Sequence, residues 1–169
     1  MTRAKKRTSR PKPPPTEPLP VEVQVDVRDV RVPGGRPALA AFLRALGAEA
    51  SRRLGRPVAL AFVLVDDVTI REVNARMLGH DWATDVITFP WAEAPALEAE
   101  LMLSVETARR EAAERGHDPA DELALYAVHG VLHLLGHDDH DPAARRRMRS
   151  AERRWLERLG RPAVFGRRS

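Results

Sequence analysis

Hydrophobic and polar residues alternate along several segments of the chain in the way that β-strands require. Residues 21–30 (VEVQVDVRDV) alternate apolar and polar side chains, which predicts a half-buried strand. Residues 58–67 are apolar without interruption up to two aspartates, which predicts a buried strand. We also expect strands at 85–89, stopping near Pro90, and at 101–105.

The segments between and after these strands repeat their apolar residues every three or four positions, as amphipathic helices do. Asp67 is expected to cap the helix that leads to Met77, and Asp118 followed by Pro119 is typical of another helix start. The predicted helices cover residues 36–54, 68–77, 106–115, 119–135 and 142–159. The order β-α-β-α-β-β-α-α-α predicts an α+β fold, a single domain with helices packed on a mixed sheet of about four strands.

The two ends of the chain differ in composition from the middle. Residues 1–20 contain six basic residues, six prolines and one acid, so we predict a disordered, basic, proline-rich arm. The length of 169 residues and the apolar content of 43% suit one hydrophobic core. We therefore expect one folded domain at residues 21–160, followed by a basic C-terminal tail at 161–169.

The charge and the residue types that are missing narrow the class of function. A net charge of +4 and a pI near 10.3 favour an anionic partner, with nucleic acid first. The chain has no cysteine, which excludes disulfides, cysteine zinc ribbons and thiol catalysis. No apolar run approaches the roughly 18 residues of a membrane span, and the N-terminus lacks an apolar signal core. We therefore expect a cytoplasmic protein without membrane contact.

A histidine cluster is the strongest indication of chemistry. His129 and His133 are four residues apart on a predicted apolar helix, so both imidazoles face one side and can hold one metal ion. Gly136 can end this helix, and the run His137-Asp138-Asp139-His140 that follows offers a third ligand. Three protein ligands with one open position are typical of catalytic zinc. We predict a metallohydrolase domain with one zinc ion per chain, held on a helix that is central in the fold.

The residue after the first histidine is informative about the reaction. In the H-E-x-x-H motif of metalloproteases a glutamate at this position is the general base. Here the position holds Gly130, so that base is missing. The sequence therefore disfavours a protease of this type.

Three blocks resemble the YbeY family, single-strand-specific metal-dependent endoribonucleases of bacteria. HGVLHLLGHDD at 129–139 resembles the signature H-G-x-L-H-L-x-G-Y-D-H. Residues 74–90 resemble the second block of the family, an asparagine followed by a T-D/N-V-L-S-F-P strand, and residues 100–112 resemble its G-D-I-x-I-S-V-E-x-A strand and helix. The resemblance covers about residues 21–159 in the same order. It implies maturation of ribosomal RNA, chiefly at the 3′ end of 16S rRNA, and ribosome quality control, with single-stranded RNA and the small ribosomal subunit as partners.

The resemblance also places the third metal ligand, where the chain departs from the signature. The third ligand of the family lies six residues after the second histidine, and that position is Asp139. A carboxylate oxygen is a legitimate zinc ligand, so we favour Asp139. A loop longer by one residue would bring in His140, which is the alternative.

Other catalytic and RNA-binding groups are less well defined by the sequence. A metal-bound water is the expected catalytic group, and Asp138 and His137 are candidate general bases only because they are close in sequence. The position of an arginine thought to contact RNA in the family is Leu78, and Arg76 and His80 are nearby substitutes. The other candidate RNA contacts, just past the metal loop, are Arg145 and Arg146.

Two other classes of function stay open at this point. One is a zinc-dependent hydrolase of another substrate, such as a metalloprotease. The other is a non-catalytic, ribosome-associated protein with a structural metal, whose closed site could use both Asp139 and His140.

Overall fold

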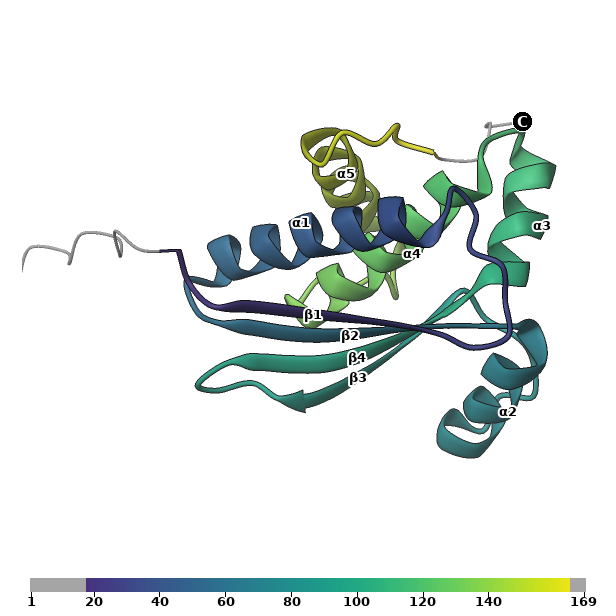
Figure 1. Cartoon of the computed structure of the whole chain (residues 1–169), viewed down its shortest axis with the longest axis horizontal. Helices are drawn as coiled ribbons and strands as arrows, with labels where there is room; N and C mark the ends of the chain where they lie inside the picture. The colour runs from purple at the N-terminus through teal and green to yellow at the C-terminus, as the bar shows by residue number, and fades with distance from the viewer. Residues whose placement is uncertain (1–17, 165–169) are drawn as a thin grey trace, which may run out of the picture.

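A four-stranded sheet with helices packed on it forms the domain in the computed structural model, which describes residues 18–164 (Figure 1). The strands are β1 (Val21–Val27), β2 (Val58–Val65), β3 (Val86–Ala92) and β4 (Leu97–Ser104). The helices are α1 (Arg36–Leu54), α2 (Asp67–Leu78), α3 (Val105–Arg115), α4 (Pro119–Leu134) and α5 (Pro142–Arg158). The predicted α+β fold and its order of elements are confirmed.

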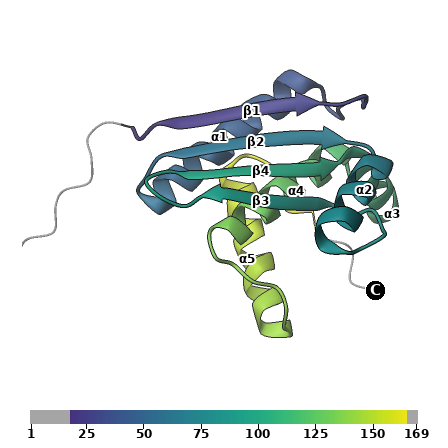
Figure 2. The same cartoon turned by 90° about the horizontal axis from the view of Figure 1, so that it is seen from below.

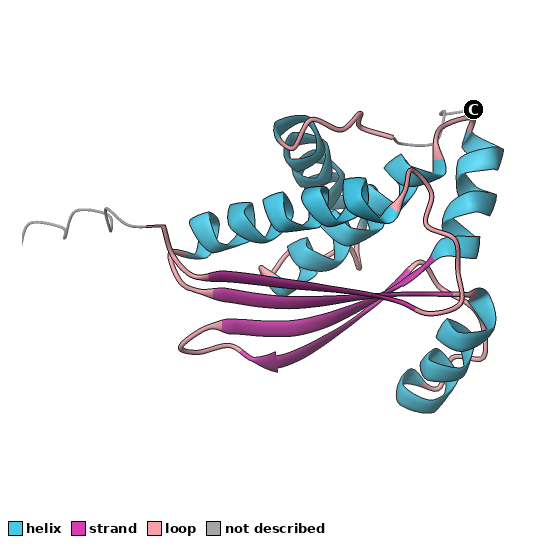
Figure 3. Cartoon of the chain, in the orientation of Figure 1, coloured by secondary structure: helices cyan, strands magenta, loops and turns pink. Residues whose placement is uncertain are grey.

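The strands lie in the order β1-β2-β4-β3, as the view from below shows (Figure 2). β1 pairs with β2 and β2 with β4 in parallel, whereas β3 runs antiparallel to β4 at one edge. α1, α4 and α5 cover one face of this mixed sheet, and α2 packs at the other face (Figure 3). The parallel strands therefore end together at one side of the sheet, where α2 and α3 begin.

Several predicted boundaries differ from the structure: β1 ends at Val27 rather than at residue 30, and β4 begins at Leu97 rather than at residue 101. Two further boundaries are wrong for reasons that lie in the tertiary structure. β3 continues through Pro90 to Ala92, because an edge strand can leave one side of its backbone unpaired and so tolerates a residue without an N–H. The cap of α2 is Asp66, whose side chain accepts from the Thr69 amide at 2.7 Å. Asp67 is instead the first residue of the helix, and its carboxylate binds the Thr107 hydroxyl at 2.6 Å.

Helix α4 runs through the centre of the molecule, between the sheet and α5 (Figure 1). Its apolar side chains belong to the main core together with those of α1, β2, β4 and α5. Gly130 faces β3 and β4 so closely that an added Cβ would lie 2.6 Å from Leu101 Cδ2 and 3.0 Å from Thr88 Cγ2. The absence of a side chain at this position therefore lets α4 pack directly on the strands, and this contact sets the distance between the helix and the sheet.

The predicted terminal segments are described only in part. Most of the predicted arm, residues 1–17, lies outside the described residues, and so does 165–169 of the predicted tail. The first part of that tail packs on the domain: Arg161 pairs with Asp121 at 3.0 Å, and Val164 is buried in the main core. Within the described range, none of the helices is both long and apolar enough to cross a membrane.

Candidate metal centre and cleft

His129 and His133 project from the same side of α4, one helical turn apart. Their Nε2 atoms lie 3.0 Å from each other, and the two rings are nearly perpendicular, at an interplanar angle of 83°. Both side chains are partly exposed, at 21% for His129 and 31% for His133. The pair therefore lies at the surface of the apolar helix, where a ligand from solvent can reach both nitrogens.

Asp139 returns toward this pair from the loop after α4. Its two carboxylate oxygens lie 3.8 Å from His129 Nε2 and 3.8 Å from His133 Nε2. A tetrahedral zinc ion with bonds of about 2.0–2.2 Å holds its ligand atoms about 3.3–3.6 Å apart. The Nε2 atoms are 3.0 Å apart, just below that range, and each is 3.8 Å from an Asp139 oxygen, just above it. The three groups are therefore close enough together to hold one such ion.

His140 lies elsewhere, although the sequence left it as an alternative ligand. Its side chain is 89% exposed, and its Nε2 lies 3.4 Å from Asp138 Oδ1. The Asp138 carboxylate is turned back onto the loop, where it accepts from the backbone amides of Asp139 at 2.7 Å and His140 at 3.2 Å. This local turn directs the Asp139 side chain toward the histidine pair and His140 away from it.

The other nitrogen of each histidine is held by a second group. His133 Nδ1 lies 3.0 Å from the carbonyl oxygen of His137, and because a carbonyl only accepts, this nitrogen carries the proton. His129 Nδ1 donates to the Glu152 carboxylate at 2.6 Å. In the neutral rings both Nε2 lone pairs then face each other and the Asp139 carboxylate. Such an arrangement repels itself unless a proton or a metal cation lies between the groups, and it is the arrangement that metal-binding histidines usually have.

The charge around His129 also favours a cation. Burial lowers the pKa of His129, but the hydrogen bond and charge of Glu152, together with the charges of Asp85 and Asp139, outweigh burial and raise it above its usual value. Three carboxylates therefore surround one imidazole. The same three carboxylates that raise this pKa would also attract a metal cation.

We expect Glu152→Gln to weaken zinc binding by about 10–100-fold, the usual effect of removing the partner of a ligating histidine. The amide has nearly the same shape but cannot fix the His129 tautomer by accepting with a full negative charge. Competition for zinc with a fluorescent chelator measures the affinity. Glu157→Gln, an exposed position on the same helix, is the matched control, and equal affinities of the two variants would contradict a supporting role for Glu152.

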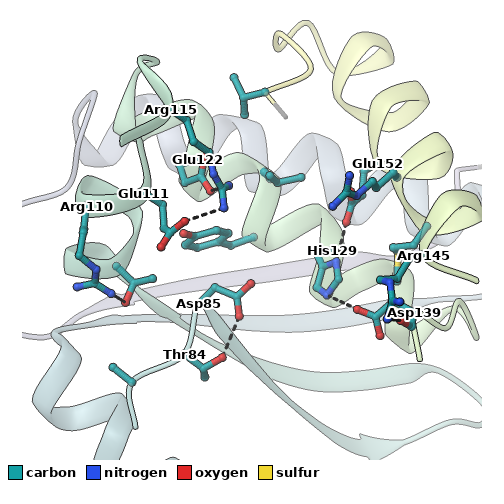
Figure 4. A pocket seen from close by; sticks show the side chains of 17 residues that line it. Thr84, Asp85, Arg110, Glu111, Arg115, Glu122, His129, Asp139, Arg145 and Glu152 are labelled. Atoms are coloured by element: carbon teal, nitrogen blue, oxygen red, sulfur yellow. Dashed lines mark hydrogen bonds and ion pairs between the residues drawn. The ribbon is translucent and has the colours of Figure 1, made fainter. Parts of the chain in front are cut away.

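A cleft of about 820 Å³ opens beside the histidine pair (Figure 4). His129 and Asp139 lie at one end of it, and Arg110, Glu111 and Arg115 from α3 lie at the other. Asp85, the residue before β3, faces His129 across the cleft. The carboxylate of Asp85 accepts from the Thr84 hydroxyl at 3.0 Å and from the Val86 amide at 2.8 Å. The wall of the cleft opposite the candidate metal site is therefore polar, and it carries a hydrogen-bond acceptor that is held in a fixed position.

Glu152 and Asp85 were not singled out from the sequence. Glu152 has a recognisable signal, because it lies four residues after Met148 and three before Trp155, on the apolar side of α5. A glutamate on such a face is buried only with a partner, here His129. Asp85 gave no comparable signal, since an aspartate before a strand is an ordinary turn residue.

The candidate RNA contacts are divided between three places. Arg145 lines the cleft, and so does Arg149 one turn further along α5, whereas Arg146 does not. His80 stacks on Trp82 with ring centroids 4.6 Å apart, in the loop that leads to the cleft wall. Arg76 lies on α2, beside a separate hollow lined by residues of that helix and Asp81.

The candidate general bases lie away from the cleft. The side chains of His137 and Asp138 line a different groove, on the other side of the loop. Burial and the positive charge of Arg154 lower the pKa of His137 below its usual value. Within the described residues, the carboxylates that line the cleft beside His129 are Asp85, Asp139 and Glu152, together with Glu111 and Glu122 further away along it.

These features define a class of protein, an α+β domain with a candidate three-ligand metal site at the end of an open, arginine-lined cleft. The family model described as Endoribonuclease YbeY matches residues 37–160, and the chain belongs to this family.

Individual relatives agree with this assignment. The chain is 46% identical over 100 residues to Endoribonuclease YbeY of Rhodopirellula baltica, a match that covers 57% of this chain and 52% of that protein. It is 40% identical over 127 residues to Endoribonuclease YbeY of Solibacter usitatus, covering 75% of this chain and 81% of that protein. The solution structure of TM1509 from Thermotoga maritima has the same fold, with a TM-score of 0.59 and 24% identity over 81% of this chain and 88% of that one.

Proposed function

We propose that this chain is a metal-dependent endoribonuclease that cuts single-stranded RNA, with one zinc ion held by His129, His133 and Asp139. The observation that carries the proposal is the pair of Nε2 atoms, 3.0 Å apart, each 3.8 Å from the Asp139 carboxylate at the end of the cleft. Membership of a family described as endoribonuclease supports RNA as the substrate. Within residues 18–164, no fourth histidine or acid joins this group of three, which argues against a closed structural site.

Different residues of the cleft have different proposed roles in phosphodiester cleavage. Zinc, when bound, would act as a Lewis acid and lower the pKa of a water molecule. Arg145 and Arg149 line the same cleft and form no ion pair within the described part of the chain, so their charges are available to a scissile phosphate. Glu152 and the His137 carbonyl orient the two imidazoles.

Asp85 is proposed to position the attacking oxygen rather than to serve as the essential base. The Thr84 hydroxyl and the Val86 amide fix one of its carboxylate oxygens, and the group faces His129 across the cleft (Figure 4). The family block that this segment resembles accepts either aspartate or asparagine at this position. An amide also presents an acceptor oxygen but cannot take a proton, so what the position requires is the acceptor.

The biological role proposed is processing of ribosomal RNA, including the 3′ end of 16S rRNA, and ribosome quality control in the cytoplasm, with the small ribosomal subunit as partner. The net charge of +4 supports a polyanionic partner. His80, stacked on Trp82 at the approach to the cleft, and Arg76 and Arg146 on the surface are proposed as further RNA contacts.

Cleavage assays with the zinc-loaded chain test the proposal. We expect single-stranded RNA labelled at one end to be cut internally, a matched duplex to be cut much less, and casein to stay intact. His133→Ala removes one ligand and should bring RNA cleavage down to background, since the remaining two groups cannot retain the ion. RNA cleavage equal in the wild type and His133→Ala would overturn the proposal, and digestion of casein would replace it with a protease.

A further inference from the structure

Four arginines of α5 lie in two pairs on opposite sides of this helix. Arg145 and Arg149, four residues apart, face the cleft that holds His129. Arg147 and Arg154, seven residues apart, face a second groove of about 430 Å³. This second groove, named here the distal groove, is lined by Gly136, His137, Asp138, Arg147, Ser150 and Arg154.

The loop that carries the candidate metal ligand separates the two hollows. Asp139 lines the cleft, and its neighbour Asp138 lines the distal groove. The same loop supplies His137, whose carbonyl holds His133 from the groove side. A chain that passes over this loop therefore leaves the cleft beside the metal ligands and enters the distal groove directly.

Within residues 18–164, neither arginine of the distal groove forms an ion pair, although the charge of Arg147 acts on the nearby Asp141 carboxylate. Arg71, Arg110 and Arg115 show the usual situation in this protein, because each forms an ion pair with an aspartate or a glutamate. Arg147 forms no such pair, and Arg154 donates to the Ser150 hydroxyl at 2.6 Å. Both side chains are exposed. Neither charge is held in an ion pair, so a polyanion can use them.

The acid in the distal groove does not cancel these charges. Asp138 accepts from two backbone amides of its own loop, at 2.7 and 3.2 Å, and lies 3.4 Å from His140. Along α5, seven residues separate Arg147 from Arg154, which is about 10.5 Å of helix axis. This spacing allows the two guanidinium groups to contact different phosphates of one strand.

We propose that the distal groove binds the backbone of single-stranded RNA on the far side of the cleaved bond, while the cleft binds the near side. This inference rests on the proposed function and adds a binding site to it. An endonuclease cuts within a strand, so it has to hold nucleotides on both sides of the scissile phosphate. The cleft and the distal groove flank the candidate metal site in the way this requirement demands.

The salt dependence of RNA binding tests the distal groove without using catalysis. Metal-free protein is titrated with a fluorescent 12-nucleotide RNA at several salt concentrations, and anisotropy gives the dissociation constant. Arg147→Ala with Arg154→Ala should lower the slope of log affinity against log salt by about 1.4, because each phosphate contact to a single strand contributes about 0.7.

Two controls separate a local contact from a general loss of charge or of folding. Arg31→Ala with Arg44→Ala removes the same charge from exposed positions outside both hollows and should keep the wild-type slope. Arg147→Lys with Arg154→Lys should restore the slope, since counterion release depends on charge. Equal slopes for the wild type and the alanine variant would overturn the proposal that the distal groove binds RNA. An equally large fall of the slope in the Arg31/Arg44 control would overturn it as well.

The two proposals fail in different ways. If the wild-type protein does not cut RNA but the alanine variant shows the expected lower slope, the endoribonuclease proposal fails and the distal groove remains a site for single-stranded RNA. A wild-type protein that cuts RNA, with the slope unchanged in the alanine variant, keeps the activity and removes the groove.

Discussion

Asp139→Ala is expected to lower zinc affinity by more than the about 10–100-fold that loss of a supporting group costs, and to abolish RNA cleavage. His140→Ala is expected to leave both properties nearly unchanged. The reason is geometric: the Asp139 oxygens lie 3.8 Å from both Nε2 atoms, whereas the His140 side chain is 89% exposed and turned toward Asp138. Chelator competition measures the affinity, and cleavage of labelled single-stranded RNA measures the activity.

A third variant makes the comparison sharper. Asp139→His places an imidazole where the family signature has one, and we expect it to keep zinc because three imidazoles are an established ligand set. If His140→Ala lost zinc while Asp139→Ala kept it, the loop would hold the ion in a different register and the assignment of Asp139 would be wrong. Equal small effects of both substitutions would mean that neither residue is a ligand.

Much of the fold follows from patterns that are local in sequence. The alternation at 21–27 and the apolar run at 58–65 are visible in the sequence because each strand meets its environment residue by residue. Pro90 misled the prediction, since whether a strand tolerates proline depends on whether it lies at an edge. The choice of Asp67 as the cap was wrong for a similar reason: Thr107, 40 residues away, binds this carboxylate, and Asp66 is the cap.

The candidate site likewise contains some residues that follow from local sequence patterns and others that only tertiary packing brings together. The side-by-side placement of His129 and His133 follows from helical periodicity alone. Glu152, Asp85 and Arg149 reach the site from α5 and β3, and only the packing of these elements brings them to α4. The choice between Asp139 and His140 depends on one turn, in which the Asp138 side chain binds the backbone of its own loop. Sequence spacing could not decide it, because a loop can gain or lose one residue at little cost.

Gly130→Glu would recreate the H-E-x-x-H motif, and we expect it to unfold the protein rather than to produce a protease. An added Cβ alone meets Leu101 at 2.6 Å, Thr88 at 3.0 Å and Val86 at 3.2 Å. A carboxylate at this point would be buried without a partner against the apolar sheet, at a cost of about 3–5 kcal/mol, added to the strain of overpacking. That is a large part of the about 5–15 kcal/mol by which a typical domain is stable. Denaturant unfolding, followed by circular dichroism, measures the loss.

A double-mutant cycle shows whether the contact with the sheet is the cause. Gly130→Ala should lose about 0–2 kcal/mol, because overpacking costs about 1–3 kcal/mol and alanine gains about 1 kcal/mol over glycine in a helix. Leu101→Ala alone should lose about 2–5 kcal/mol as a buried cavity. Together they should lose less than the sum, since the Cβ at residue 130 enters the space that Leu101 leaves. Strict additivity, or a stable Gly130→Glu, would contradict this account of the glycine. A positive result means that the packing of α4 on the sheet itself excludes a glutamate base at residue 130.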